Sequence, residues 1–342
     1  MKKKNLKSTF VFFLFLTIFY FITCLSLYII SVAFFKQGKV IDLPVFREYQ
    51  INFSEKIGDR IVWQAKKDCV EYDEQLIYVP KINFTCEFNN VEYKTTLNFD
   101  EQGRKSNYRK ILKKNLTDLE FSRGIAILGD SVAMGYGVND DQVFSVLLEK
   151  KIKRPVYNLA VSSYATDREI IRFSKLKLIN YVDTIIIFYA DNDFGENLAN
   201  NNLSPKKNAQ DLFNTLISNQ FDSSFGKFRK MVRYAIQIPL QELRRKTHYI
   251  DWQKHEEQFI NVLKRYPFIH DKKIYVIVVP TSLERRNYYK NFEPKYYKEY
   301  KLEFLYVQNE KEDYYVIDGH PNYKGHEKIA DFIYNKLKVT KF

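Results

Sequence analysis

Three short segments at the ends of apolar runs, and a fourth before the C-terminal helix, contain residue types that could together perform acyl transfer. They are residues 129–131 (Gly-Asp-Ser), 158–164 (Asn-Leu-Ala-Val-Ser-Ser-Tyr), 191–193 (Asp-Asn-Asp) and 318–322 (Asp-Gly-His-Pro-Asn). Each segment alone has an ordinary explanation as a turn or a helix cap. Together they would supply a nucleophile, oxyanion donors, an acid and a base, and this convergence indicates an active site.

Ser131, His320 and Asp318 are the candidate catalytic residues. A serine hydroxyl is a weak nucleophile until a base within hydrogen-bond reach takes its proton, and His320 is the candidate base. We expect Asp318 to orient the imidazole and to stabilise its charged form. Two alternatives stay open, because His326 could replace His320 as the base and Asp313 could replace Asp318 as the acid.

Alternating strands and helices would position these segments. Apolar runs at residues 124–128, 155–159, 183–189 and 273–279 predict buried strands, whereas residues 144–151, residues 167–178 and the apolar face of Ile329, Ile333 and Leu337 predict helices. The alternation predicts an α/β domain over residues 123–342, a three-layer sandwich with a central parallel sheet, interrupted by a longer helical insertion at about residues 195–265. Ligands bind beyond the carboxyl ends of the strands in such sheets, where the polar segments lie.

Residues 36–122 would form a connector and a small β-rich unit. Short strand-like runs occur at residues 60–63, 75–79 and 91–97. Cys69 and Cys86 lie in this unit, 17 residues apart, and we expect them to form a disulfide worth about 3 kcal/mol. The alternative is two unpaired buried thiols. Because no histidine stands near these cysteines we expect no zinc site, and we expect no other metal or cofactor.

The N-terminal segment predicts a single-pass membrane anchor. Residues 1–9 form a basic head, and residues 10–35 are 26 consecutive residues without a charge. As a helix they would be about 39 Å long, enough to cross a hydrocarbon core of about 30 Å. The lysines favour a cytoplasmic N-terminus, which puts the catalytic domain outside the cytoplasm, in the periplasm or at the cell surface. The alternative is a cleaved signal peptide with a small-x-small site at residues 31–33, although such peptides usually have a shorter apolar core.

The net charge of +13 does not by itself identify a partner. A basic surface attracts nucleic acid, anionic lipid or acidic polysaccharide. Apart from the N-terminal head and a denser run at residues 227–254, the basic residues are spread along the chain, and no nucleic-acid motif accompanies them. We therefore interpret the charge mainly as compositional bias and expect no nucleic-acid partner.

The four segments resemble the sequence blocks of the SGNH (GDSL) hydrolase superfamily. Residues 127–131 are similar to the first block, which carries the nucleophile on a strand-to-helix turn, and residues 158–164 are similar to the second. Residues 192–193 resemble the third block and residues 318–322 the last. The resemblance covers the predicted α/β domain, but not the anchor or the β-rich unit. It implies a flavodoxin-like three-layer fold and the activity of a serine esterase or O-acyltransferase.

The resemblance also implies the oxyanion donors. These would be the backbone N–H groups of Ser131 and Ser163 and the side-chain amide of Asn192, each worth about 100- to 1000-fold in rate. Ser163 stands where the family usually has glycine. If that glycine serves a positive φ or a close backbone approach, serine strains the oxyanion hole, and if only the N–H is needed, serine suffices. The Asp-x-His spacing of Asp318 and His320 is shorter than the common Asp-x-x-His and resembles that of the alginate O-acetyltransferase relatives.

The expected function is hydrolysis or transfer of an ester-linked acyl group, which we expect to be acetyl, on an envelope or secreted glycan. This expectation depends on the resemblance to anchored SGNH proteins associated with surface polysaccharides. The expected partners are an acylated glycan and, through the N-terminal helix, a membrane. Two alternatives are a catalytically inactive carbohydrate-binding or assembly protein, which Ser163 favours, and a lipid esterase, which the anchor favours.

Overall fold

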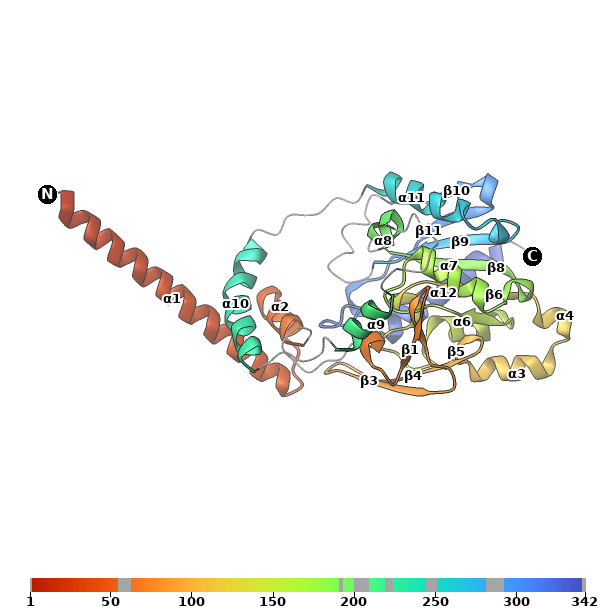
Figure 1. Ribbon diagram of the computed structural model, residues 1–342, viewed down its shortest axis with the longest axis horizontal. Coiled ribbons are helices and arrows are strands. Elements are labelled where there is room, and N and C mark those ends of the chain that lie inside the picture. Colours follow the sequence, from red (N-terminus) through yellow and green to blue (C-terminus); the bar gives the residue numbers. More distant parts are fainter. Residues whose placement is uncertain are drawn as a thin grey trace. The chain divides into compact units, whose positions relative to one another are not determined.

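The computed structural model is that of a mixed α/β protein in two compact units (Figure 1). It describes residues 2–54, 63–190, 193–199, 209–218, 224–243, 251–280 and 292–339. The first unit comprises Met1–Ile61, Asn219–Lys246 and Val316–Asp318, and the second comprises Val62–Ser218, Thr247–Tyr315 and Gly319–Phe342. The division does not follow chain order, because the first unit takes a segment from the middle of the chain.

A six-stranded, mostly parallel sheet forms the centre of the second unit. Its strand order is β10-β11-β9-β8-β6-β7. The strands are β6 (Gly124–Leu128), β7 (Val156–Asn158), β8 (Val182–Tyr189), β9 (Lys273–Val278), β10 (Lys295–Tyr297) and β11 (Leu302–Tyr306). Only the edge pair β10–β11 is antiparallel among these neighbours. The four strands expected from apolar runs are present, and β10 and β11 extend the sheet beyond them.

The apolar runs are continuous because the central strands are buried on both faces. All five residues of β6 are buried, and so are the last six residues of β8. The two strands are parallel neighbours, with Leu128 opposite Ile187. Their carboxyl ends therefore lie at one edge of the sheet, where residues 129–131 leave β6.

Helices follow most of the strands in the second unit. They are α3 (Asn107–Asn115), α4 (Asp118–Phe121), α5 (Ser131–Met134), α6 (Phe144–Ile152), α7 (Thr166–Lys175), α8 (Asp193–Ala199), α9 (Ala209–Ser218), α11 (Trp252–Lys264) and α12 (Tyr323–Val339). The C-terminal helix α12 packs against α6, and its buried face contains Ile329, Ile333 and Leu337, as expected from their spacing.

Two small antiparallel sheets precede β6 in the chain. One pairs β1 (Val70–Asp73) with β2 (Ile77–Pro80), and the other has the order β3 (Thr85–Asn89), β4 (Lys94–Asp100), β5 (Gly103–Arg104). Of the strand expected at residues 60–63, residues 60–62 lie outside the described ranges, and Trp63 begins a 3₁₀ turn. The small sheets and the central sheet share one hydrophobic core, in which Trp63 and Leu97 join Ile127.

A disulfide joins Cys69, just before β1, to Cys86 in β3, with their Cα atoms 5.5 Å apart. Closing a loop of this length restricts the unfolded chain, so a Cys69→Ser/Cys86→Ser variant should lose about 3 kcal/mol of unfolding free energy. Denaturant titration without reductant measures this loss. Reductant should lower the wild-type midpoint towards that of the variant and leave the variant unchanged. Equal midpoints without reductant would contradict the prediction.

The described part of the first unit contains the α-helices α1 (Lys2–Lys36), α2 (Pro44–Asn52) and α10 (Ser224–Leu243). Within α1, Ser8–Lys36 is long and apolar enough to cross a membrane, with a mean hydropathy of 2.5. Tyr28, Tyr49, Ala235 and Ile238 form the buried core of this unit. Within the described ranges, the expected insertion at about residues 195–265 contains α9, α10 and α11, and α10 packs on α1 and α2 (Figure 1).

Candidate active site

Ser131 and His320 form a hydrogen-bonded pair in the second unit. The Oγ atom of Ser131 and the Nε2 atom of His320 are 2.8 Å apart, although the residues are 189 positions apart in the chain. Ser131 is the first residue of α5, and His320 lies in the loop before α12. Both side chains are only half-buried, so the pair can be reached from solvent. This is the geometry of a nucleophile and its general base.

Glycine and aspartate fix the turn that presents Ser131. Gly129 has a φ of +150°, and a Cβ there would lie 2.5 Å from the Cβ of Ala133 and 2.8 Å from the Cβ of Phe188. Asp130 caps α5 by accepting a hydrogen bond of 2.9 Å from the Val132 N–H. The tripeptide Gly-Asp-Ser thus ends the buried strand and begins a helix at the serine.

Aromatic and backbone contacts hold the imidazole of His320. The Tyr136 ring lies 4.6 Å from it at an interplanar angle of 30°, and Phe88 of β3 packs edge-on against Tyr136 at 4.7 Å. The Tyr136 N–H donates to the Ser131 carbonyl, and the Tyr315 N–H donates to the His320 carbonyl at 2.9 Å. Tyr136 therefore contacts both members of the pair.

The two alternative residues have other partners. His326 is fully buried, its Nδ1 accepts from the Phe144 N–H, and its ring is stacked parallel to the Phe144 ring. Burial, followed by the charges of Arg104 and His320, lowers the pKa of His326 to about 3. The Asp313 carboxylate accepts from the Glu310 N–H and from Lys328 Nζ, both at 2.6 Å. His326 and Asp313 thus organise the C-terminal segment, and Ser131 is paired with His320.

Asp318, the expected acid, is half-buried two residues before His320. It is grouped with the first unit, and His320 with the second. Its role in orienting the imidazole stays a prediction. The expected oxyanion donor Asn192 lies outside the described residues, as does Asp191.

The loop that contains Ser163 runs beside the turn at residues 129–131. The ladder between β6 and β7 continues past both strands, with the Val161 N–H donating to the Gly129 carbonyl at 3.0 Å. Ser131 lies two residues after Gly129, and Ser163 lies two residues after Val161. Ser163 has a φ of +63°, so this position is one that favours glycine, which was the first of the two possibilities raised by the sequence.

Side chains from other segments hold the Ser163 loop in its left-handed conformation. Gln64 donates through Nε2 to the Ser163 Oγ at 3.0 Å and accepts through Oε1 from Ser162. The Tyr78 hydroxyl, whose pKa is raised to about 12 by burial, donates to the Ser162 carbonyl at 2.6 Å. Arg168 donates to the Ser163 carbonyl. Sequence reasoning missed these residues because none belongs to a recognisable motif.

Ser163→Gly should keep ester turnover at or above the wild-type rate, because glycine adopts the positive φ without strain. Ser163→Val should lower turnover, because a β-branched side chain at this φ costs about 1–3 kcal/mol and displaces the N–H. The matched control is Lys153→Val, at an exposed residue with a φ of 54°. It should lower the melting temperature without changing kcat/KM, and equal kcat/KM for Ser163→Gly and Ser163→Val would refute the role of the backbone angle.

Arg104, in β5, binds the segment that follows α5, the helix that begins at Ser131. Its guanidinium donates to the carbonyls of Met134, Gly135 and Val138 at 2.5–2.8 Å and to the Asp140 carboxylate at 2.9 Å. The Arg104 side chain is fully buried. Sequence reasoning missed this residue because Arg104 stands in a polar stretch that reads as a surface connector.

No model of a known protein family matches this chain, and no curated protein matches it either. The interpretation of the site therefore depends on its geometry and on the four short sequence blocks. Within the described ranges, no group of three or more His, Cys, Asp or Glu side chains is arranged to hold a metal ion.

Glu169 of α7 is a buried carboxyl group next to the turn at residues 129–131. Neither of its carboxyl oxygens has a hydrogen-bond partner among the described residues. Burial, followed by the charges of Asp193 and Asp130, raises the pKa of Glu169 well above its ordinary value. Glu169 is therefore protonated in the folded protein at a pH where the unfolded chain has lost that proton.

Glu169→Gln should make the protein more stable as pH rises, relative to the wild type. The unfolded carboxyl group ionises near pH 4.5, whereas the folded one keeps its proton to higher pH. Above pH 4.5 unfolding releases this proton, so wild-type stability falls by up to about 1.4 kcal/mol per pH unit until the folded pKa is reached. Melting temperatures at about pH 5 and pH 7 measure the difference. The exposed control Glu101→Gln should show no such change, and the same result for Glu169→Gln would contradict the prediction.

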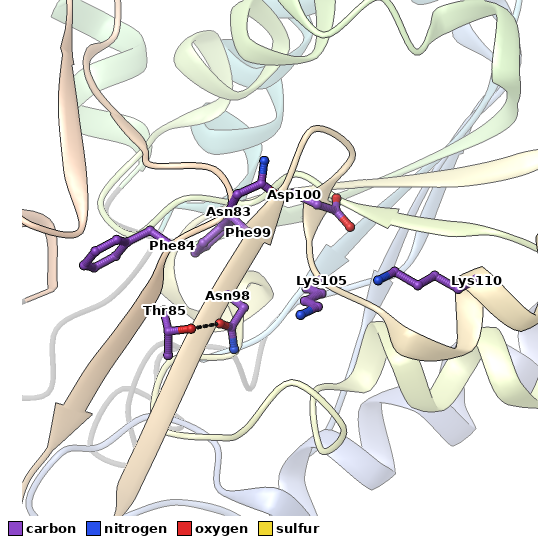
Figure 2. Close-up of a pocket in the computed structure, with 8 residues that line it drawn as sticks. All are labelled: Asn83, Phe84, Thr85, Asn98, Phe99, Asp100, Lys105 and Lys110. Carbon is purple, nitrogen blue, oxygen red and sulfur yellow. Dashed lines mark hydrogen bonds between the residues drawn. The ribbon is translucent and has the colours of Figure 1, made fainter.

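A separate cavity of about 290 Å³ lies between the small β3–β4 sheet and the start of α3 (Figure 2). It is lined by Asn83, Phe84, Thr85, Asn98, Phe99, Asp100, Lys105 and Lys110. The Thr85 hydroxyl donates to the Asn98 side-chain oxygen at 2.7 Å. Ser131 and His320 are not among the residues that line this cavity as the structure describes it.

Proposed function

We propose that the chain is a serine-dependent esterase or acyltransferase of the SGNH kind, with Ser131 as nucleophile and His320 as base. The observation that carries this proposal is the 2.8 Å distance between Ser131 Oγ and His320 Nε2. The strand-to-helix turn at Gly129 supports it, because such a turn exposes a nucleophile at the edge of a parallel sheet. The proposed fold of the catalytic domain is the three-layer sandwich of that superfamily.

The proposed reaction begins when Ser131 Oγ attacks the ester carbonyl carbon while His320 Nε2 takes the hydroxyl proton. The tetrahedral oxyanion would be bound by the N–H groups of Ser131 and Ser163 and by the amide of Asn192. As the intermediate collapses, the imidazolium gives its proton to the leaving alcohol, and an acyl-serine forms. Water or a sugar hydroxyl then attacks the acyl carbon and His320 takes its proton; as the bond between the acyl carbon and Ser131 Oγ breaks, the imidazolium returns that proton to Oγ. Asp318 would hold the imidazole in orientation.

We propose an acylated, in particular acetylated, envelope or secreted glycan as substrate. The apolar helix α1 supports a single-pass anchor, and the lysines before it support a cytoplasmic N-terminus. The Cys69–Cys86 disulfide supports an oxidising compartment for the rest of the chain. These features favour a glycan outside the cytoplasm over an intracellular ester.

The cavity of Figure 2 favours a second candidate function, a carbohydrate-binding protein without catalysis. It offers amide, hydroxyl and ammonium groups, and the half-exposed Phe84 ring could stack on a sugar. Lys105 and Lys110 would attract an acidic or phosphate-bearing glycan. This candidate predicts glycan binding that survives loss of the Ser131 hydroxyl.

Turnover of short-chain aryl esters by the full-length protein in detergent, with and without a glycan acceptor, tests the proposal. A fluorophosphonate probe should label Ser131 in the wild type and lose that label in His320→Ala. Acceleration by the acceptor would identify a transferase, and its absence a hydrolase. Wild-type protein that binds glycan but neither reacts with the probe nor turns over any ester or glycan acetyl group would instead support the binding function.

A further inference from the structure

Helix α10 contains a proline, and a tyrosine of α2 supplies a donor in place of the N–H that this proline lacks. Pro239 lies inside α10 and has no N–H, so the carbonyl of Ala235, four residues earlier, loses its donor within the helix. The Tyr49 hydroxyl of α2 donates to the Ala235 carbonyl at 2.9 Å. The Tyr20 hydroxyl of α1 donates to the Ile236 carbonyl at 3.3 Å. These bonds fix the position of α10 against α2 and along α1, where Ile236 lies beside Tyr20.

The contact between Tyr20 and Ile236 lies inside the apolar span of α1. A membrane-crossing helix needs about 20 residues, and any 20 consecutive residues taken from 10–35 include Tyr20. At 1.5 Å per residue, the Tyr20 Cα would lie roughly 14–22 Å below the end of such a span that is nearer Lys36. If α1 crosses a membrane, the backbone of α10 near Ile236 therefore lies below the membrane surface as well.

Helix α10 exposes both apolar and basic side chains. Its packed face contains Ala235 and Ile238, whereas Phe225 and Leu243 near its two ends are 76% and 83% exposed. Basic residues occupy its first half, at positions 227, 229, 230 and 233. Exposed aromatic and aliphatic side chains next to long cationic ones are typical of helices that contact both acyl chains and headgroups.

We propose that α10 inserts into the bilayer beside α1, with lipid acyl chains against its exposed apolar residues and anionic headgroups against its basic ones. The protein would then hold the bilayer through two helices from distant parts of the chain. The inference depends on the membrane location proposed for α1, and it adds a lipid contact from the middle of the chain.

Depth-dependent quenching in vesicles of phosphatidylethanolamine and phosphatidylglycerol tests this inference. Full-length protein with Cys24→Ala would carry one added cysteine, Phe228→Cys or Leu243→Cys in α10, labelled with an environment-sensitive fluorophore. Ile29→Cys in the exposed surface of α1 is the control for lipid contact, and Tyr181→Cys in the second unit is the control for water contact. Nitroxide lipids should quench the α10 and Ile29 labels, and aqueous iodide should quench only the Tyr181 label.

The outcomes distinguish a failure of the lipid contact of α10 from a failure of the membrane location of α1. If the α10 labels respond only to iodide while the Ile29 label responds to nitroxide lipid, α10 lies outside the bilayer and the inference is wrong. If the Ile29 label also responds only to iodide, the proposed membrane location of α1 fails, and the inference fails with it. Neither result bears on ester turnover at Ser131.

A rescue experiment tests the proline compensation independently. Tyr49→Phe removes the donor to the Ala235 carbonyl and should lower the melting temperature of the protein in vesicles. Pro239→Ala restores an N–H within α10, so the double variant should regain most of that loss. A double variant that melts no higher than Tyr49→Phe alone would show that this hydroxyl does not serve the proline-freed carbonyl.

Discussion

Ser131→Ala and His320→Ala are each expected to lower ester turnover by about 10⁴- to 10⁶-fold, to a similar residual rate. The nucleophile and its base act as one unit, since without the imidazole the Ser131 hydroxyl keeps its proton at neutral pH. For the same reason the double variant should be no slower than either single variant. Steady-state kcat with a short-chain aryl ester measures the effect, and near-wild-type turnover by Ser131→Ala would exclude this mechanism.

The neighbouring residues supply the controls for this prediction. His326→Asn keeps an acceptor for the Phe144 N–H and should retain most of the turnover per folded molecule. Asp318→Asn should be severe yet leave more residual rate than loss of the base, because it disturbs the orientation and charge of the imidazole without removing it. Asp313→Asn should change stability more than turnover, because its carboxylate is bonded to Lys328 and to the Glu310 backbone.

Arg104→Ala is expected to lower the free energy of unfolding by about 3–5 kcal/mol. It leaves three buried carbonyl groups and the Asp140 carboxylate without their cationic donor. Arg104→Lys should recover little of the loss, since an ammonium group cannot reproduce the fork of donors. Denaturant titration measures the change.

The control for Arg104 is Arg123→Ala, at an exposed residue, with an expected change below about 0.5 kcal/mol. Turnover by the folded Arg104→Ala protein should also fall, because the segment that Arg104 binds begins at the end of the helix that Ser131 starts. If Arg104→Ala unfolds at the same denaturant concentration as Arg123→Ala, the bonds of Arg104 contribute nothing to stability.

Much of the central sheet could be predicted because strands buried on both faces must be apolar at every position. β6 and β8 show this pattern directly. The edge strand β10, with the sequence Lys-Tyr-Tyr, does not need this pattern, and β11 beside it has Glu303 half-exposed, so neither had a signal distinct from a Tyr- and Lys-rich surface. Likewise the helical pattern of α10 indicates that one face is buried, but a periodicity does not name the partner.

Some residues of the candidate site could likewise be predicted from the sequence, and others could not. Ser131 and His320 could be proposed from sequence because they stand in short, ordered segments, and the structure brings them together. Gln64 and Arg104 could not, because their bonds arise from the folding of one segment onto another far along the chain. The positive φ of Ser163 was an open question in sequence terms, since serine does not by itself indicate a left-handed backbone.

The hydrogen bond between Tyr49 and Ala235 spans 186 residues and therefore sets an order of events during synthesis. At about 5–20 residues per second, α1 and α2 leave the ribosome roughly 10–40 s before α10. The first two helices must wait for their third member while much of the parallel sheet emerges, and the nascent chain carries an open apolar surface for that time. A shortened protein without α1 would leave α10 without one of its packing partners. Deleting the first 36 residues would strip the covering from Ala235 and Ile238, and the fragment would aggregate through that patch unless a chaperone or detergent covered it.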